Sequence, residues 1–380
     1  MTLTGKTILL GVTGSIAAVE TVRLIHALKR KGAIIQPVMS QAACGIIHPD
    51  ALTYASERET ITRISGHVEH VTYCGDEGIA DLLLIAPCTA NTISKIACGI
   101  DDTTVTTFAT TALGRRMPVI LVPAMHHAMF RHDIVMKNLG ILVQSGVTVV
   151  GPRIEEGKAK IADINEIVLW CERLLSGGPL SGKRVLITSG RCEEPVDDVR
   201  VLTTRSSGKM GQELAYEAFR LGAEVIIIHR DTINPLKNIR ASTARSMGDA
   251  IRSVLNEKIP DIYISAAAIS DFAPEQICGK IPSGKPVSIA LKPLPKLLDL
   301  TLGKIPIIVA FKLGYAAREE AGALLRQGVS MVLANTPENL GAEEGTYTVM
   351  DASGSHTISG KKHEIATAVF ERIISGHIPS

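Results

Sequence analysis

The residues from Thr203 to Gly211 have the composition of a phosphate-binding helix start. They read Thr-Thr-Arg-Ser-Ser-Gly-Lys-Met-Gly and open a run with helical apolar periodicity. Small residues let an anion approach the backbone N–H groups, and the helix dipole favours negative charge there. Arg205 and Lys209 add positive charge, and Ser206 or Ser207 is expected to cap the helix. The pattern favours a phosphate site over a helix cap without a ligand.

Other candidate side chains are histidines and one lysine. His67 and His70 are three residues apart, a spacing that suits either a pair of metal ligands or an ordinary surface loop. His126 follows an expected strand end, where a site role and a structural role are equally open. Lys280 lies in a glycine-containing loop, from which it could reach a phosphate or simply remain solvated.

Apolar runs separated by helical segments must position these residues. In the first half, strands are expected at 8–12, 34–39, 82–86, 119–122 and 147–150, and a helix at 164–175. Ligands bind at the carboxyl ends of such parallel strands, where this chain has Gly14, Ser15 and the polar segment 87–92. One short glycine turn suits a mononucleotide phosphate, as in FMN, better than a dinucleotide. Residues 155–160 are expected to form a charged loop.

A second α/β pattern follows the turn-rich segment 176–182, which is expected to be a linker. Strands are expected at 184–188, 225–228, 262–265, 307–310 and 331–334, then a hairpin at 346–358 and a helix at 362–374. The sequence therefore predicts two Rossmann-like, doubly wound α/β domains, at 1–175 and 183–380.

The composition excludes several classes of protein. The 380 residues carry 40 Lys and Arg against 38 Asp and Glu, and only 3% are aromatic. This balance argues against a nucleic-acid or membrane-surface partner. The seven cysteines form no C-x-x-C pair or zinc-like cluster, and neither a signal peptide nor a transmembrane run is expected. These features favour a cytoplasmic protein with reduced thiols.

An ordered set of motifs resembles a known family. The motifs lie at 11–18, 86–93, 99–102, 123–125, 205–211 and 266–272 and span nearly the whole chain. They resemble the bifunctional coenzyme A biosynthesis flavoproteins, in which phosphopantothenoylcysteine decarboxylase is joined to phosphopantothenate–cysteine ligase. His126 and the short loop 155–160 look like the archaeal branch of that family.

The resemblance implies two reactions. In the first, an NTP, CTP in bacterial members, activates the carboxylate of 4'-phosphopantothenate as an acyl-nucleotidylate, with Mg²⁺ offsetting the triphosphate charge, and cysteine's amine then attacks. In the second, FMN oxidises the product's thiol so that CO₂ can leave. The family also implies a homo-oligomer of flavin-domain trimers joined by ligase-domain dimers, with small-molecule substrates and no nucleic-acid or membrane partner.

Residue roles carry over by position. The catalytic histidine is one of His67 and His70, and the local sequence favours His70. The other expected catalytic residues are His126 and Lys280. The FMN-binding residues implied are Gly14, Ser15, Ser40, Thr89, Asn91, Thr92, Ala124 and Met125. The implied nucleotide and substrate residues are Thr204, Arg205, Ser206, Ser207, Gly208, Lys209, Met210, Ala267, Asp271, Lys280, Phe311 and Lys312.

Three positions depart from bacterial members. His126 replaces an asparagine, Thr204 replaces a ligase asparagine, and residues 155–160 lack the cysteine thought to protonate the decarboxylation intermediate. Two alternatives therefore stay open: a flavin-dependent decarboxylase or prenyltransferase acting on another substrate, and a non-catalytic flavin-binding regulatory protein. The second α/β unit favours the two-step enzyme.

Overall fold

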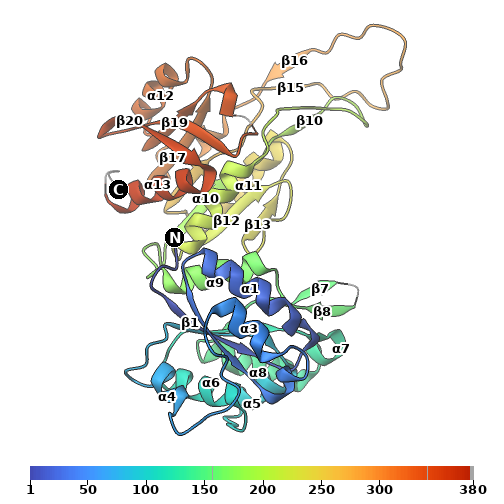
Figure 1. Ribbon diagram of the computed structural model, residues 1–380. Coiled ribbons are helices and arrows are strands. Elements are labelled where there is room, and N and C mark those ends of the chain that lie inside the picture. Colours follow the sequence, from blue (N-terminus) through green and yellow to red (C-terminus); the bar gives the residue numbers. More distant parts are fainter. Residues whose placement is uncertain (156, 340, 377–380) are drawn as a thin grey trace. The chain divides into compact units, whose positions relative to one another are not determined.

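The structure is a computed structural model that describes residues 1–155, 157–339 and 341–376. Within it the chain divides into two compact units, unit 1 (Met1–Gly177) and unit 2 (Gly178–Ser380). Each unit has its own central sheet (Figure 1).

Unit 1 is built on a five-stranded parallel sheet in the order β2-β1-β3-β4-β6. Its strands are β1 (Thr7–Val12), β2 (Ile34–Met39), β3 (Leu82–Cys88), β4 (Val119–Pro123) and β6 (Thr148–Val149). The central strands β1, β3 and β4 are almost wholly buried, which explains their continuous apolar sequence. The strands expected from the sequence are confirmed, with β6 shorter than expected.

Helices cover both faces of this sheet (Figure 1). Residues that alternate along β1 separate into two cores, since Ile8 and Leu10 pack with α1 and α9, whereas Leu9 packs with α5, α6 and α8. The helical segments are η1 (Ile16–Glu20), α1 (Thr21–Arg30), α2 (Gln41–Cys44), α3 (Pro49–Ser56), α4 (Glu69–Cys74), α5 (Ala90–Ala97), α6 (Thr104–Gly114), α7 (His127–Phe130), α8 (Asp133–Gln144) and α9 (Ile164–Leu175). This is a doubly wound α/β arrangement, as the sequence predicts.

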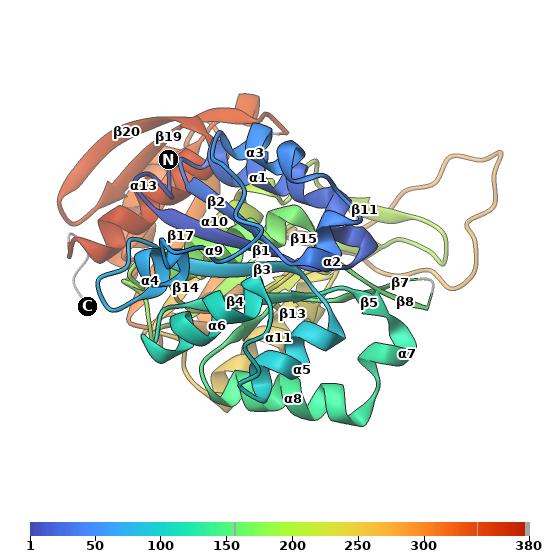
Figure 2. The ribbon, with the colours of Figure 1, turned by 60° about the horizontal axis from the view of Figure 1, so that its bottom comes forward.

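The charged segment at 155–160 is not the simple loop that its composition suggests. Two short strands, β7 (Arg153–Glu155) and β8 (Lys158–Lys160), form a hairpin, and β8 pairs with β5 (Met125–His126) (Figure 2). Three-residue strands carry too little periodicity to be recognised, and the pairing partner lies more than 30 residues away in sequence. The hairpin forms one wall of the cavity described below.

Unit 2 has an eight-stranded mixed sheet in the order β13-β12-β9-β14-β17-β18-β19-β20. Its first six strands are parallel, and the terminal hairpin β19–β20 is antiparallel. The strands are β9 (Arg184–Thr188), β12 (Glu224–His229), β13 (Lys237–Arg240), β14 (Ile262–Ser265), β17 (Ile307–Leu313), β18 (Met331–Asn335), β19 (Glu344–Asp351) and β20 (Gly354–Lys361). The expected strands and hairpin are confirmed.

Two helical layers enclose this sheet as well. Helix α10 packs on β9 and β12 and against α13, while α11, η2 and α12 enclose the core on the other face. The bounds are α10 (Lys209–Arg220), α11 (Ala244–Glu257), η2 (Leu297–Leu300), α12 (Ala317–Arg326), η3 (Pro337–Asn339) and α13 (Lys362–Ile374). The fold class expected for both units is confirmed.

Two small ribbons complete unit 2, one formed by β10 (Glu193–Pro195) and β11 (Val201–Thr203), the other by β15 (Phe272–Pro274) and β16 (Leu291–Pro293). The exposed segment between β15 and β16 extends away from the main sheet of unit 2 (Figure 1). Within the described residues, no helix is long and apolar enough to cross a membrane.

Candidate functional sites in the two units

Hydrogen bonds join the loops at the carboxyl edge of the unit 1 sheet. The Thr13 hydroxyl, which is buried, donates to Pro87 O (2.8 Å) and accepts from the Thr89 N–H (3.0 Å). The Ala124 N–H donates to Cys88 O (3.1 Å), so the loops after β1, β3 and β4 are tied together. The sequence analysis missed Thr13 as this connector, although its place directly after a strand was a usable signal.

Two of the expected FMN residues lie at the ends of β1 and β2. A Cβ on Gly14 would lie 2.7 Å from Ala42 Cβ, so only glycine lets the first loop pack this closely on α2. Ser40 is 7% exposed, and its buried Oγ has no hydrogen-bond partner among the residues that the structure describes. Because a buried hydroxyl without a partner is costly, Ser40 is well suited to bind a polar ligand atom.

The start of α5 presents hydroxyl and amide groups at the same edge. Thr89 caps the helix, since its Oγ1 accepts from the Thr92 N–H (3.3 Å), and the two hydroxyls lie 3.0 Å apart. Asn91 is exposed beside them. A helix start with free N–H groups and small hydroxyls has the donor set that binds a phosphate, and these residues therefore fit the phosphate of FMN.

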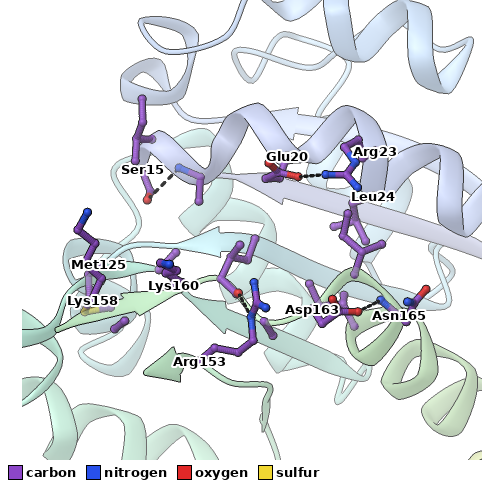
Figure 3. Close-up of a pocket in the computed structure, with 18 of the residues that line it drawn as sticks. Ser15, Glu20, Arg23, Leu24, Met125, Arg153, Lys158, Lys160, Asp163 and Asn165 are labelled. Atoms are coloured by element: carbon purple, nitrogen blue, oxygen red, sulfur yellow. Dashed lines mark hydrogen bonds and ion pairs between the residues drawn. The ribbon is translucent and has the colours of Figure 1, made fainter. Parts of the chain in front are cut away.

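A cavity of about 920 Å³ opens beside this edge, within unit 1. Its walls come from η1, α1, the β5–β8–β7 ribbon and the start of α9 (Figure 3). Ser15, Ala124, Met125 and His126 line it. The other expected FMN residues, Gly14, Ser40, Thr89, Asn91 and Thr92, lie at the sheet edge but do not line this cavity.

Most charged groups on the cavity wall are basic. Arg23, Arg30, Arg153, Lys158 and Lys160 line it, against Glu20 and Asp163. Arg23 pairs with Glu20 (3.1 Å) and Arg153 with Glu155 (3.5 Å), while the Asp163 carboxylate caps α9 by accepting from the Asn165 N–H (2.8 Å). The excess of positive charge favours an anionic occupant.

A hydrogen bond to His126 defines which of its ring nitrogens carries the proton in the neutral form. Its Nδ1 accepts from the Ala128 N–H (3.3 Å) at the start of α7, so a neutral ring carries the proton on Nε2. The side chain is exposed on a cavity wall, and His126 is paired with Lys158 across β5 and β8. His126 therefore offers a hydrogen-bond donor, Nε2–H, on the wall of a cavity whose charged groups are mostly basic.

The two candidate histidines at the start of α4, His67 and His70, differ in environment. His67 is exposed, whereas His70 is half-buried on α4 with its ring edge-on to Phe108 at 6.5 Å. His70 Nδ1 is buried, and none of the described residues forms a hydrogen bond with it. Glu69 accepts hydrogen bonds from the Ser65 hydroxyl and N–H, which lower its pKa to about 2 and fix the start of α4. The two histidines therefore differ in burial, and His70 does not line the cavity.

In unit 2, the stretch 203–211 starts α10 in a way that differs from the expectation. The prediction that Ser206 or Ser207 caps the helix is wrong, because the N-cap is Gly208, at φ 75°, without a side-chain cap. A Cβ added to Gly208 would lie 2.9 Å from Gly190 Cα, and a Cβ added to Gly211 would lie 2.3 Å from Ser189 Oγ. Both glycines are needed for α10 to approach the loop after β9 this closely.

An open cleft lies at this helix start. Seven expected nucleotide residues line it: Ser206, Ser207, Gly208, Lys209, Met210, Ala267 and Phe311. Residues outside the predicted set also line it, among them Asn335, Asn339, Tyr347 and Lys362. Phe311 and Tyr347 meet edge to face at 6.1 Å, and Tyr347 is buried. The ends of β17 and β18 and the start of α13 therefore contribute to the cleft, which position along the strands could have indicated.

The remaining ligase candidates lie outside the cleft lining. Thr204 Oγ1 is buried and lacks a hydrogen-bond partner within the described part of the chain, and Arg205 and Asp271 are exposed. Lys312 pairs with Glu320 (2.7 Å). The exposed Lys280 lies on the extended segment between β15 and β16 (Figure 1).

Hydrogen bonds fix the base of the Lys280 segment. Asp197 Oδ2 accepts from the Ile281 N–H (3.0 Å), and Asp198 Oδ2 accepts from the Gly279 N–H (3.0 Å). The Ile281 N–H, with Val199, Arg200 and the Arg200 guanidinium, holds the pKa of Asp197 well below its usual range. The position of Lys280 is therefore set by the loop after β10.

Two family descriptions match the two units in turn. Residues 1–176 match the flavoprotein family, and residues 180–377 match the C-terminal domain of the DNA/pantothenate metabolism flavoproteins. The coenzyme A biosynthesis bifunctional protein CoaBC of Thermococcus kodakarensis is 42% identical, covering 98% of this chain and 95% of the relative. The chain belongs to the CoaBC family. The CoaBC proteins of Methanocaldococcus jannaschii and Vibrio cholerae are 34% and 30% identical, each over 98% of this chain.

Membership in the CoaBC family accounts for the two-unit architecture. The protein is a bifunctional enzyme of coenzyme A biosynthesis that ligates cysteine to phosphopantothenate and carries out a flavin-dependent decarboxylation. The sheet edge and cavity of unit 1 lie in the part of the chain that matches the flavoprotein family. The cleft at α10 lies in the part that matches the C-terminal domain of the DNA/pantothenate metabolism flavoproteins. In the described residues of this CoaBC chain, no cluster of three or more His, Cys, Asp or Glu could hold a metal ion.

Proposed function

We propose that unit 1 binds FMN along the carboxyl edge of its sheet and decarboxylates 4'-phosphopantothenoylcysteine there. The observation that carries this proposal is the unpartnered Ser40 hydroxyl, at the same edge as the capped start of α5. Ser40, Thr89 and Thr92 would hold the phosphate, with Gly14, Ser15 and Asn91 around it. Ala124 and Met125 would contact FMN from the end of β4. When bound, FMN supplies the two-electron chemistry that makes loss of CO₂ possible.

Histidines on two sides of the flavoprotein domain would handle the protons. His70, with its unpartnered Nδ1, takes the proton from the substrate. His126, whose neutral ring carries its proton on Nε2, would donate a hydrogen bond from Nε2 to the decarboxylated intermediate, beside a segment, 153–160, whose sequence has no cysteine. The basic cavity orients the phosphorylated substrate.

We further propose that the cleft of unit 2 binds an NTP, with CTP the preferred one. The backbone N–H groups at the start of α10, with Lys209, would hold its phosphates. Lys280 would stabilise charge on the carboxylate of 4'-phosphopantothenate as it forms an acyl-nucleotidylate and pyrophosphate leaves. Cysteine's amine then attacks the acyl carbon and releases the nucleoside monophosphate.

The other residues of the ligase site would serve binding. Thr204, Arg205, Ser206 and Ser207 extend the phosphate loop, and Ala267, Asp271, Phe311 and Lys312 would surround the nucleotide. Because the described residues hold no metal cluster, Mg²⁺ would enter with the triphosphate, whose oxygens bind it.

Exposed apolar side chains support a homo-oligomeric, cytoplasmic enzyme. Ile16 is 77% and Tyr54 84% exposed in unit 1, and Phe272 is 50% exposed in unit 2. Such residues on both units fit trimers formed by the flavoprotein domain and dimers formed by the ligase domain. Sedimentation velocity of the full chain tests this assembly.

The decisive experiment supplies the purified protein with 4'-phosphopantothenate, cysteine, Mg²⁺ and each of the four NTPs in turn. We expect pyrophosphate first and CO₂ later, fastest with CTP, and an absorbance spectrum of bound FMN. Pyrophosphate with every NTP alike would refute the CTP preference. Bound flavin without pyrophosphate or CO₂ would instead favour another substrate or a regulatory role.

A further inference from the structure

Lys362 is a largely buried lysine in the wall of the unit 2 cleft. The residue is 7% exposed, although it is the first residue of α13 and lines the cleft together with Gly208 and Lys209. Among the described residues, no hydrogen bond or salt bridge joins Lys362 Nζ to a partner. A charge on a largely buried side chain is unfavourable without a partner, so an anion that enters the cleft beside Lys362 would be stabilised.

The carboxylates near Lys362 offset its positive charge only in part. Burial and the neighbouring Lys209 lower its pKa, and Glu343 and Glu213 oppose this only in part. Glu343 forms its salt bridge with Lys209 instead, and both side chains are substantially exposed. Lys209 and Lys362 therefore both line the cleft, and the neighbouring Glu343 carboxylate forms a salt bridge only with Lys209 among them.

Two helix starts meet at this cleft. Helices α10 and α13 pack against each other, and the first residues of both line it. The Lys362 N–H donates to Glu343 O (3.2 Å), which fixes the start of α13 beside the segment that carries Glu343. Because the positive ends of the two helix dipoles add to the lysine charges, the cleft has an anion-binding character that α10 alone would not give.

We propose that Lys362 binds a phosphate group of a ligase substrate and that Glu343 forms its salt bridge with Lys209 only while that phosphate is not bound. This inference rests on the proposed nucleotide site in unit 2. The incoming phosphate replaces Glu343 on Lys209 and gives Lys362 the partner that it lacks. Because the phosphate must break the Lys209–Glu343 salt bridge to bind, that salt bridge lowers the affinity for the phosphate. Removal of the Glu343 carboxylate should therefore raise this affinity.

The phosphate could come from the triphosphate of the nucleotide or from 4'-phosphopantothenate. Calorimetric titration of the full-length protein with CTP and with inorganic tripolyphosphate tests the first source, and the KM for 4'-phosphopantothenate tests the second. Lys362→Gln should weaken one of them by about tenfold to a hundredfold, the usual effect of losing a hydrogen bond to a charged group. Lys362→Arg should restore most of the loss.

Matched variants separate this role from general charge effects. Lys361→Gln removes the same charge one position earlier on an exposed side chain and should change affinity less than about threefold. Glu343→Gln should strengthen binding of the same phosphate by a few fold. Decarboxylation of supplied 4'-phosphopantothenoylcysteine should be unchanged in every variant, which reports correct folding of unit 1, and thermal melting reports on unit 2.

The outcomes are distinguishable. If the wild type binds neither CTP nor tripolyphosphate, the proposed nucleotide site is wrong. If the wild type binds them but Lys362→Gln changes neither that affinity nor the KM for 4'-phosphopantothenate, the role of Lys362 is refuted. Weaker binding after Glu343→Gln would contradict the exchange of partners on Lys209.

Discussion

Gly211→Ala tests whether the close approach of α10 to the β9 loop shapes the ligase cleft. The new Cβ would lie 2.3 Å from Ser189 Oγ and 2.6 Å from Ser189 Cβ. Ser189 is fully buried, and its hydroxyl donates to Gly208 O (3.1 Å), so it cannot move without releasing the helix start. The substitution must therefore push the start of α10 away from the sheet.

The expected magnitude follows from two opposing effects. Overpacking of this kind costs about 1–3 kcal/mol, near the upper end here because backbone-linked atoms clash, and alanine's higher helix propensity returns about 1 kcal/mol. The net loss of about 2 kcal/mol corresponds to a fall in Tm of about 4–8 °C for a unit of this size. Gly322→Ala on α12 is the matched control, since its Cβ would meet only Arg326 Nη1, at 3.6 Å. It should raise Tm by about 1–4 °C.

Calorimetric melting and CTP titration of both variants provide the assay. Gly211→Ala should weaken CTP binding, because the N–H groups of the first turn move, while Gly322→Ala should leave it unchanged. Decarboxylation of supplied 4'-phosphopantothenoylcysteine should persist in both. If Gly211→Ala melts higher than the wild type and binds CTP normally, the close approach has no role in shaping the cleft.

Three further predictions concern unit 1. His67→Asn should leave the decarboxylation rate nearly unchanged, because His67 is exposed; a large loss in single-turnover flavin absorbance would mean that His67, and not His70, is the base. Ser65→Ala should raise the pKa of Glu69 from about 2 towards 4.5, so a stabilising contribution present above pH ~4.5 and lost towards pH 2 would become smaller, while the hydrogen bond from the backbone N–H of residue 65 remains; a carboxyl titration by NMR that stays near 2 would contradict this. Residues 1–175 alone should fold and bind FMN, and a soluble fragment that takes up no added FMN would count against this.

The sequence predicted the parts of the structure that depend on local pattern. Buried parallel strands are continuous apolar runs, so β1, β2 and β9 were placed nearly to the residue. The hairpin at 153–160 was missed because its pairing with β5 is non-local and its strands are three residues long. The N-cap was misassigned because the serines at 206 and 207 suit that role in isolation, whereas packing against Gly190 requires glycine at 208.

The site residues, too, could be predicted where they depend on local sequence and not where they depend on packing between distant elements. The residue pattern supplied Lys209 and the resemblance to a family supplied the role of Phe311, and the structure brings both to one cleft. Lys362 was not predicted, because its relation to Gly208 depends on the packing of two helices that lie about 150 residues apart in the chain. The environments of His67 and His70 could not be separated by spacing, since their difference in burial depends on the packing of α4 against Phe108.

The central claim is that two separate sites on this chain carry the two reactions. The most direct test measures pyrophosphate release and CO₂ release in two variants, Lys280→Gln and His70→Asn. The account predicts that Lys280→Gln loses pyrophosphate release but still decarboxylates supplied 4'-phosphopantothenoylcysteine. His70→Asn should ligate cysteine normally and release CO₂ about a hundredfold or more slowly. Loss of both activities in either variant, or of neither in both, would contradict the assignment.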